Sequence, residues 1–214
     1  MSINFFHIFD PIKYLCKRSM KKLYLNQIRG FINSIAPITD QDWHLFEKRL
    51  IYKEFSKNEI LLYAGDVEQY IYFMTEGITR IFQYKNDTEY TLRFNFPIST
   101  FNSYVSFISQ TPSLISVETL TNIKAFRMSY QNMQSLYDES KNAERVGRKM
   151  IEYIYMQREM KELQLHSRTA EDYYCDLLKT NKELIQQIPQ KYLASYLGIT
   201  PESLSRIRKN NCKP

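Results

Sequence analysis

The feature that most constrains the fold is a series of short apolar or alternating segments between residues 51 and 128. Turn residues separate these segments about every 8–12 positions, a spacing typical of an antiparallel sandwich or barrel. The segments are Ile51–Phe55, Glu59–Tyr63, Tyr70–Thr75, Ile78–Tyr84, Glu89–Phe96, Leu114–Leu120 and Ile123–Met128. Residues 100–110 interrupt the pattern, and we expect a helical turn there.

Helical periodicity flanks this strand-rich region on both sides. Apolar residues recur at helical spacing from Tyr24 to Ile35, and Thr39 is a suitable N-cap for a second helix. Ser129 is a suitable N-cap for a third, after which the pattern is helical to the end of the chain. The sequence therefore predicts an α+β protein with a central antiparallel β domain.

The helical segment from about Ser140 to Leu165 is long for a globular protein. A continuous seam with steps of four and three residues runs along it, formed by Val146, Met150, Tyr153, Gln157, Met160 and Gln164. Ile151, Ile154 and Leu165 lie on a neighbouring face. One interpretation is a dimerisation helix whose seam meets a second chain, and the other is a single wide stripe facing the chain's own core. Spacing alone does not separate them.

Charge is unevenly distributed along the chain. The 214 residues carry a net charge of +6, and residues 141–214 hold 14 basic against 9 acidic side chains. A polyanion is therefore expected at the C-terminal end. Because no apolar run approaches the roughly 20 residues of a bilayer span, we expect a cytoplasmic protein without membrane contact. Three distant cysteines, Cys16, Cys175 and Cys212, predict thiols, with no metal site and no cofactor.

Residues 188–208 have the pattern of a helix-turn-helix. Gly198 can adopt the left-handed conformation that ends a first helix, while Thr200 can cap a second helix that begins at Pro201. The residues expected to pack the two helices together are Leu193, Ala194, Leu197, Leu204 and Ile207. An ordinary helical hairpin is the alternative interpretation.

The outward face of the second helix carries the chemistry for DNA recognition. Outward residues at the N-terminal end of such a helix enter the major groove. We expect Arg206 to bind guanine and Glu202 to accept from cytosine. The residues expected to contact or position phosphates are Lys191, Thr200, Ser203, Ser205, Arg208 and Lys209. In a simple hairpin, Glu202 and Arg206 would instead form a surface salt bridge.

With these motifs, the chain resembles the cyclic-AMP receptor/FNR (Crp/Fnr) family of transcription regulators. The resemblance is carried by Ala64-Gly65-Asp66, Met74-Thr75-Glu76-Gly77 and the string 194–206, which looks like the branch common in Bacteroidetes. It implies a homodimer that binds an inverted-repeat operator, with a small-molecule effector and RNA polymerase as further partners. The implied units are an N-terminal extension and helix (1–30), a β-roll effector domain (31–138), a dimerisation helix (139–165) and a helix-turn-helix domain (166–214).

Several positions depart from the family. Ser103 and Ser113 replace the family's ribose-binding Glu and phosphate-binding Arg, so we do not expect cyclic-AMP binding. The effector is therefore unidentified, and its expected pocket is formed by Phe101, Asn102, Ser103, Tyr104, Ser113 and Leu114. Pro201 replaces a DNA-contacting Arg. No wing hairpin is expected after the second helix, so some phosphate contacts would be lost or supplied by the basic tail Arg206–Lys213.

Two other functions compete with this one. One is a β-roll ligand-binding or protein-interaction module with weakened or lost DNA binding. The other is a cupin-like metalloenzyme, which needs histidine ligands on adjacent strands. His7, His44 and His166 all lie outside the strand region, so we do not expect an enzyme.

Overall fold

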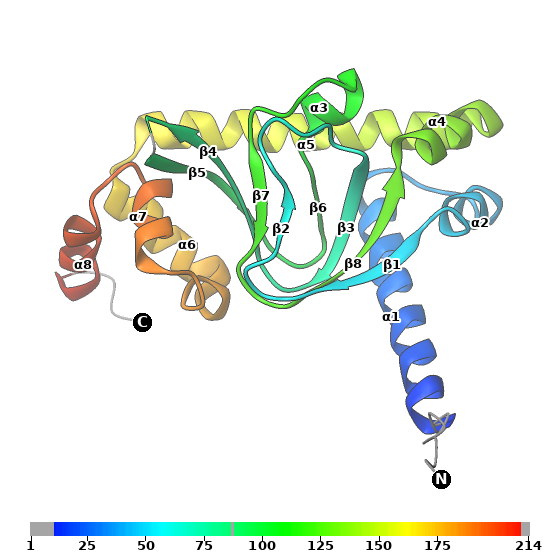
Figure 1. Cartoon of the computed structure of the whole chain (residues 1–214), viewed down its shortest axis with the longest axis horizontal. Coiled ribbons are helices and arrows are strands. Elements are labelled where there is room, and N and C mark those ends of the chain that lie inside the picture. The colour runs from blue at the N-terminus through cyan, green and yellow to red at the C-terminus, as the bar shows by residue number, and fades with distance from the viewer. Residues whose placement is uncertain (1–10, 87, 211–214) are drawn as a thin grey trace, which may run out of the picture.

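The computed structural model describes residues 11–86 and 88–210, and in this part of the chain two four-stranded antiparallel sheets form a β-roll (Figure 1). The strands are β1 (Ile51–Phe55), β2 (Ile60–Leu62), β3 (Tyr70–Glu76), β4 (Thr79–Lys85), β5 (Thr88–Asn95), β6 (Ser99–Phe101), β7 (Ser116–Thr119) and β8 (Ile123–Ser129). One sheet has the order β1-β8-β3-β6 and the other β2-β7-β4-β5. Buried side chains including Met74, Ile81 and Val117 fill the space between them. All the strands predicted from the sequence are present, and the sequence did not predict β6.

Helices precede, interrupt and follow the roll. They are α1 (Pro11–Ile35), α2 (Asp40–Glu47), α3 (Tyr104–Ser109), α4 (Tyr130–Glu139), α5 (Lys141–Ser167), α6 (Ala170–Ile185), α7 (Gln190–Tyr196) and α8 (Pro201–Asn210). The mixed α+β class and the helical turn within residues 100–110 are confirmed. Thr39 and Ser129 cap α2 and α4 as expected, each accepting a 3.1 Å bond from the backbone N–H three residues on.

The outer face of the β1-β8-β3-β6 sheet is covered by α1, α2, α4 and α5. Their buried side chains, including Ile32, Phe46 and Leu136, pack on Phe73 and Met128 of the sheet. Figure 1 shows α5 extending along the molecule from this cluster toward α6. α1 continues across residue 30, where the sequence suggested a boundary.

Some sequence expectations fall outside the described residues, namely those on residues 1–10 and on the tail beyond residue 210. Cys175 is disulfide-bonded, so the expectation of a thiol at this position was wrong. Cys212 and the side chain of Cys16 lie outside the described part of the chain. None of the described helices combines the length and apolarity needed to cross a bilayer.

Two glycines in the roll allow a matched test of turn geometry. Gly65 and Gly77 have φ of +98° and +93°, but an added Cβ has open space at Gly65 and lies 2.4 Å from the Asn122 carbonyl oxygen at Gly77. We expect Gly65→Ala to cost about 1–2 kcal/mol of unfolding free energy from conformation alone. Gly77→Ala should cost roughly 1–3 kcal/mol more, because the β7–β8 turn must move. Urea denaturation of both variants measures this difference, and equal losses would refute it.

Candidate nucleic-acid interface and effector pocket

Residues 190–210 form a two-helix unit with the local features that the sequence predicts. Gly198 has φ of +67°, and the Ile199 N–H donates to the Ala194 carbonyl across the turn at 3.1 Å. Thr200 caps α8 by accepting from the Ser203 N–H at 3.2 Å. Leu193, Ala194 and Leu204 are fully buried between the helices. These residues define the turn between α7 and α8 and the packing of the two helices on each other.

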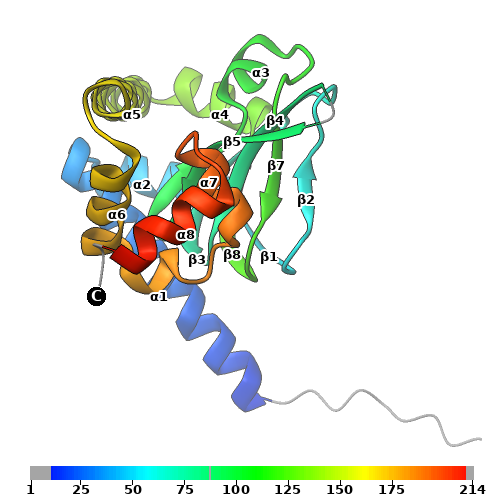
Figure 2. The ribbon, with the colours of Figure 1, turned by 90° about the vertical axis from the view of Figure 1, so that its left-hand side faces the viewer.

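The exposed face of α8 carries Glu202, Arg206 and Lys209. Figure 2 shows α8 in front of the roll, at one end of the molecule. The pKa of Glu202 is lowered, first by a bond from its own backbone N–H and then by Thr200, so this carboxylate is charged at neutral pH. Arg206 is exposed, and its Nη2 donates to Ser203 Oγ at 3.3 Å. The two predicted base-reading residues therefore share one accessible helix face.

The residues expected to contact phosphates are less uniform in their exposure. Lys191 and Thr200 are exposed, whereas Ser203 and Ser205 are half-buried on α8. Arg208 is half-buried and its Nε donates to the Tyr174 hydroxyl of α6 at 3.0 Å. In this structure Arg208 thus braces α8 against α6.

A contact that the sequence did not predict joins α7 to the roll. The Thr91 N–H on β5 donates to Ser195 Oγ at 2.9 Å, and the ring of Tyr192 stacks on the Arg80 guanidinium at 3.6 Å. Arg80 is fully buried and forms ion pairs with Glu118 at 2.6 Å and Glu89 at 2.7 Å. The two-helix unit is therefore held against the β4–β5 hairpin by both polar and aromatic contacts.

The expected effector pocket is a cavity of about 470 Å³ beside α3. Its lining includes five of the six predicted residues: Asn102, Ser103, Tyr104, Ser113 and Leu114. Ser113 Oγ donates to Ser103 Oγ at 2.8 Å, which joins the two sides of the loop. Phe101 lies instead in the core, stacked on Tyr72 at 4.7 Å, and lines a neighbouring groove toward α5.

Two residues of this cavity were missed by sequence reasoning. Arg93 on β5 and Arg158 on α5 both line it. The available signal for Arg93 was a charged side chain between the apolar residues Leu92 and Phe94 of the strand. Arg158 follows Gln157 of the proposed seam, and its position is set by how α5 crosses the roll.

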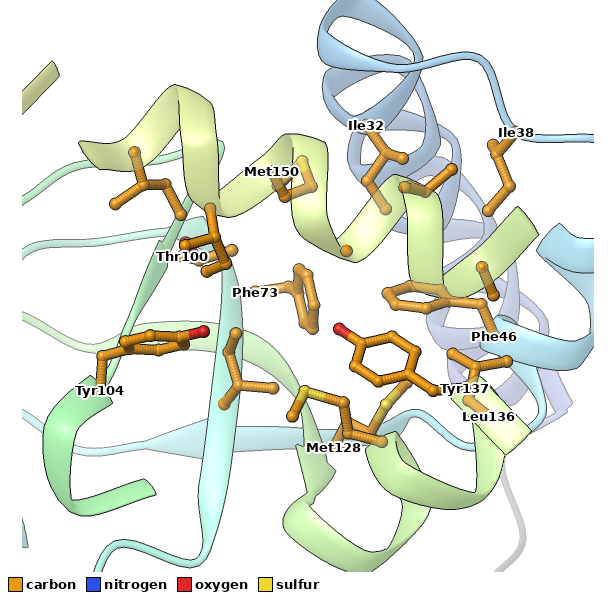
Figure 3. Close-up of a pocket in the computed structure, with 17 residues that line it drawn as sticks. Ile32, Ile38, Phe46, Phe73, Thr100, Tyr104, Met128, Leu136, Tyr137 and Met150 are labelled. Atoms are coloured by element: carbon orange, nitrogen blue, oxygen red, sulfur yellow. The ribbon is translucent and has the colours of Figure 1, made fainter. Parts of the chain in front are cut away.

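A second, smaller cavity lies beneath α5 (Figure 3). Its volume is about 70 Å³, and aliphatic and aromatic side chains such as Phe73, Met128 and Met150 dominate its lining. The lining has no charged side chain. Its polar groups are the hydroxyls of Thr100, Tyr104 and Tyr137, and no charged group is available to pair with an anionic ligand.

The loop at Ser103 rests on a buried carboxylate. Glu68 is only 2% exposed, and it accepts from the Tyr70 N–H at 3.0 Å and the Ser103 N–H at 3.3 Å. Burial raises the pKa of Glu68 to about 7, against the lowering effect of these backbone bonds. Glu68 thus connects the β3 strand to the wall of the candidate pocket.

This raised pKa predicts a pH-dependent stability. Between pH 4.5 and 7 the unfolded state releases the Glu68 proton before the folded state does, so stability falls as the pH rises. We expect the wild-type free energy of unfolding to fall by about 2–3 kcal/mol relative to Glu68→Gln over this window. Parallel denaturation curves at pH 5 and pH 8 test this, and a constant difference between the two proteins would contradict it.

The seam predicted on α5 is divided in two by the structure. Val146 and Met150 are 6% and 8% exposed and pack in the chain's own core, so their expected exposure to a partner was wrong. Tyr153 is half-buried, whereas Gln157 and Met160 are exposed; the side chains of Gln164 and Leu165 lie outside the described set. The exposed apolar residues on the second half of α5 are Tyr155, Met156, Met160 and Leu163.

Comparison with known proteins supports this description of the fold. Residues 52–140 match the family described as cyclic nucleotide-binding domain. No curated protein sequence matches the chain.

Solved structures extend the likeness beyond this domain. FixK2 from Bradyrhizobium japonicum is similar at TM-score 0.64 and 17% identity, over 75% of this chain and 83% of that one. The c-di-GMP responsive global regulator CLP of Xanthomonas campestris has TM-score 0.60 and 16% identity, over 80% and 90%. A proposed Crp/Fnr-family transcriptional regulator from Eubacterium rectale has TM-score 0.61 and 14% identity, over 80% and 82%. The chain thus shares the fold of Crp/Fnr-type regulators.

Proposed function

We propose that the protein is a dimeric, sequence-specific DNA-binding transcription regulator with a β-roll effector domain. The observation that carries this proposal is the two-helix unit, a helix-turn-helix in which Glu202 and Arg206 share the exposed face near the start of α8. Such a helix inserts its N-terminal half into the major groove. The likeness in fold to Crp/Fnr-type regulators supports the same role.

In this proposal Arg206 donates two guanidinium N–H bonds to O6 and N7 of a guanine, and Glu202 accepts from a cytosine amino group. Exposed Lys191 and Lys209 neutralise phosphates, while Thr200, Ser203 and Ser205 position the helix start. Arg208 reaches a phosphate only if it leaves Tyr174. RNA polymerase is a further partner expected of such a regulator.

The effector domain is proposed to respond to a small molecule other than cyclic AMP. Ser103 and Ser113, which replace the ribose-binding Glu and the phosphate-binding Arg of the family, hydrogen-bond to each other, so both family contacts to the nucleotide are missing at these two positions. Units 1–30, 31–138, 139–165 and 166–214 remain our proposed division of the chain.

Dimerisation is proposed along the second half of α5. Tyr153, Met156, Met160 and Leu163 are spaced by three, four and three residues, the repeat of a coiled-coil seam. Tyr153 and Met160 also belong to the seam predicted from the sequence. The difference is that Met156, and not Gln157, lies between them in the seam proposed here. A second copy of the chain would cover these apolar side chains.

We expect Met156→Glu to convert the dimer to a monomer, because a charge at the centre of an apolar seam must be desolvated. Gln157→Glu, one position along the helix, adds the same charge on the neighbouring face and should leave the dimer intact. Sedimentation velocity of both variants checks this. If Gln157→Glu dissociates the dimer and Met156→Glu does not, the chains meet along the seam predicted from the sequence, which contains Gln157 in place of Met156.

Selection from a randomised duplex library tests DNA recognition. The proposal predicts enrichment of an inverted repeat whose half-sites lie about 10 base pairs apart, or a multiple of this. A protein-interaction module that has lost DNA binding predicts no enriched motif and no steep dependence on salt.

A further inference from the structure

We infer that the cavity beside α3 binds a small organic anion between Arg93 of β5 and Arg158 of α5. The inference names the ligand class of the proposed effector domain, and so rests on that proposed function. The groups that bind the negative charge of the ligand then lie on β5 and α5, and not on the loop that carries Ser103 and Ser113.

Unpartnered donors in the cavity point to a missing acceptor. Asn102 is 6% exposed, yet its Nδ2 has no hydrogen-bond partner in the described structure. Arg93 Nε is also buried without a partner. Because an unsatisfied buried donor costs free energy, and more when it is charged, native proteins seldom retain one without a use. Both residues line the same cavity.

Arg93 and Arg158 line the same cavity, and the charge of Arg158 disfavours the charged form of Arg93. The pKa of Arg93 is lowered to about 10, mainly by burial and next by the charge of Arg158. Within the described residues, neither arginine forms an ion pair with a carboxylate. Glu162 also lines the cavity, one helical turn beyond Arg158, and both of these side chains are exposed. Half-buried Arg93 therefore places a positive charge on the strand wall of the cavity, and exposed Arg158 places a second at its α5 side.

Arg80 is a buried arginine with a structural role, and its guanidinium group has partners within the chain. Its guanidinium binds Glu118, Glu89 and Thr91, and it stacks on Tyr192. Arg93 lies on the adjacent strand and has no corresponding carboxylate partners. The contrast indicates that the missing partner of Arg93 is supplied from outside the chain.

The rest of the lining defines the body of the ligand. Apolar side chains dominate the cavity walls, and these are Ile81, Leu92, Val105, Leu114 and Ile115. A volume of about 470 Å³ accommodates a molecule with one or two rings. The expected ligand thus combines a carboxylate, sulfonate or phosphate, which pairs with guanidinium in bidentate geometry, with an apolar body.

Two fluorescent probes test the charge requirement on the full chain. 8-Anilinonaphthalene-1-sulfonate has an anionic group on an apolar body, and N-phenyl-1-naphthylamine has a similar body without the charge. We expect one sulfonate probe per chain in the cavity, bound at least about tenfold more tightly than the neutral probe. Displacement by phenyl phosphate or by phenylacetate then distinguishes a phosphate from a carboxylate ligand.

Substitutions assign the binding to this cavity. Arg93→Gln and Arg158→Gln should each weaken sulfonate binding about tenfold or more, while binding of the neutral probe stays within about twofold. Arg148→Gln, on the same helix but outside the cavity, is the matched control and should change neither. Arg93→Gln should also raise the Tm of the unliganded protein, because it removes a half-buried charge that has no carboxylate partner.

Equal affinity for the two probes, or sulfonate binding that survives both substitutions, would overturn the inference. Library selection with the same wild-type protein reports separately on DNA recognition. An enriched operator together with charge-independent probe binding would refute the anion site alone. Charge-dependent probe binding without any operator would refute DNA recognition alone.

Discussion

Arg206→Ala is expected to weaken operator binding by roughly 30-fold to 10⁴-fold. A bidentate arginine–guanine contact contributes about 1–3 kcal/mol to base discrimination, and a dimer loses two such contacts. Arg206 is exposed and its only described bond is to Ser203 on the same helix, so the fold should be unaffected. Fluorescence anisotropy with the selected duplex and with single-base variants measures the loss and its position.

Lys209→Ala is the matched control on the same exposed face of α8. It should weaken binding to all duplexes about equally and reduce the dependence of affinity on salt, because it removes a phosphate contact. If Arg206→Ala instead weakens all duplexes equally, Arg206 contacts the backbone and reads no base.

Arg80→Ala is expected to lower the free energy of unfolding by about 3–5 kcal/mol. Arg80 is fully buried, and its loss leaves Glu118 without the guanidinium 2.6 Å away. It also removes the group on which Tyr192 of α7 stacks. The midpoint of urea unfolding measures the change.

Arg148→Ala is the control for removing an arginine from an ion pair. Arg148 pairs with Glu152 on the surface of α5, and both side chains are well exposed. This substitution should cost less than about 1 kcal/mol. Similar losses for Arg80→Ala and Arg148→Ala would show that the buried network does not hold the hairpin and α7 together.

Local signals in the sequence were sufficient for most elements of the fold. Alternating segments located the strands, and the hydroxyls of Thr39, Ser129 and Thr200 marked helix starts because each satisfies a backbone N–H. β6 was missed because it has three residues and follows Pro97, so it is too short to show alternation. Its pairing with β3 depends on the rest of the sheet.

Contacts between distant elements were not predictable in the same way. Spacing placed Val146 and Met150 on one line with Met160, but α1, α2 and α4 cover only the first half of α5. Arg93 and Arg158 are far apart in sequence, and only the crossing of α5 over the roll brings both to one cavity. A periodic pattern identifies the apolar face of a helix, but it does not show which other element packs against that face.

The most direct measurement of DNA recognition is the ratio of affinities for the selected inverted-repeat duplex and for a scrambled duplex of the same length and composition. Titrations of the wild-type protein at several salt concentrations should give a ratio of at least about 10³, with both affinities falling as salt rises. Equal affinity for the two duplexes, or binding to neither, would contradict the proposal that α8 reads a DNA sequence.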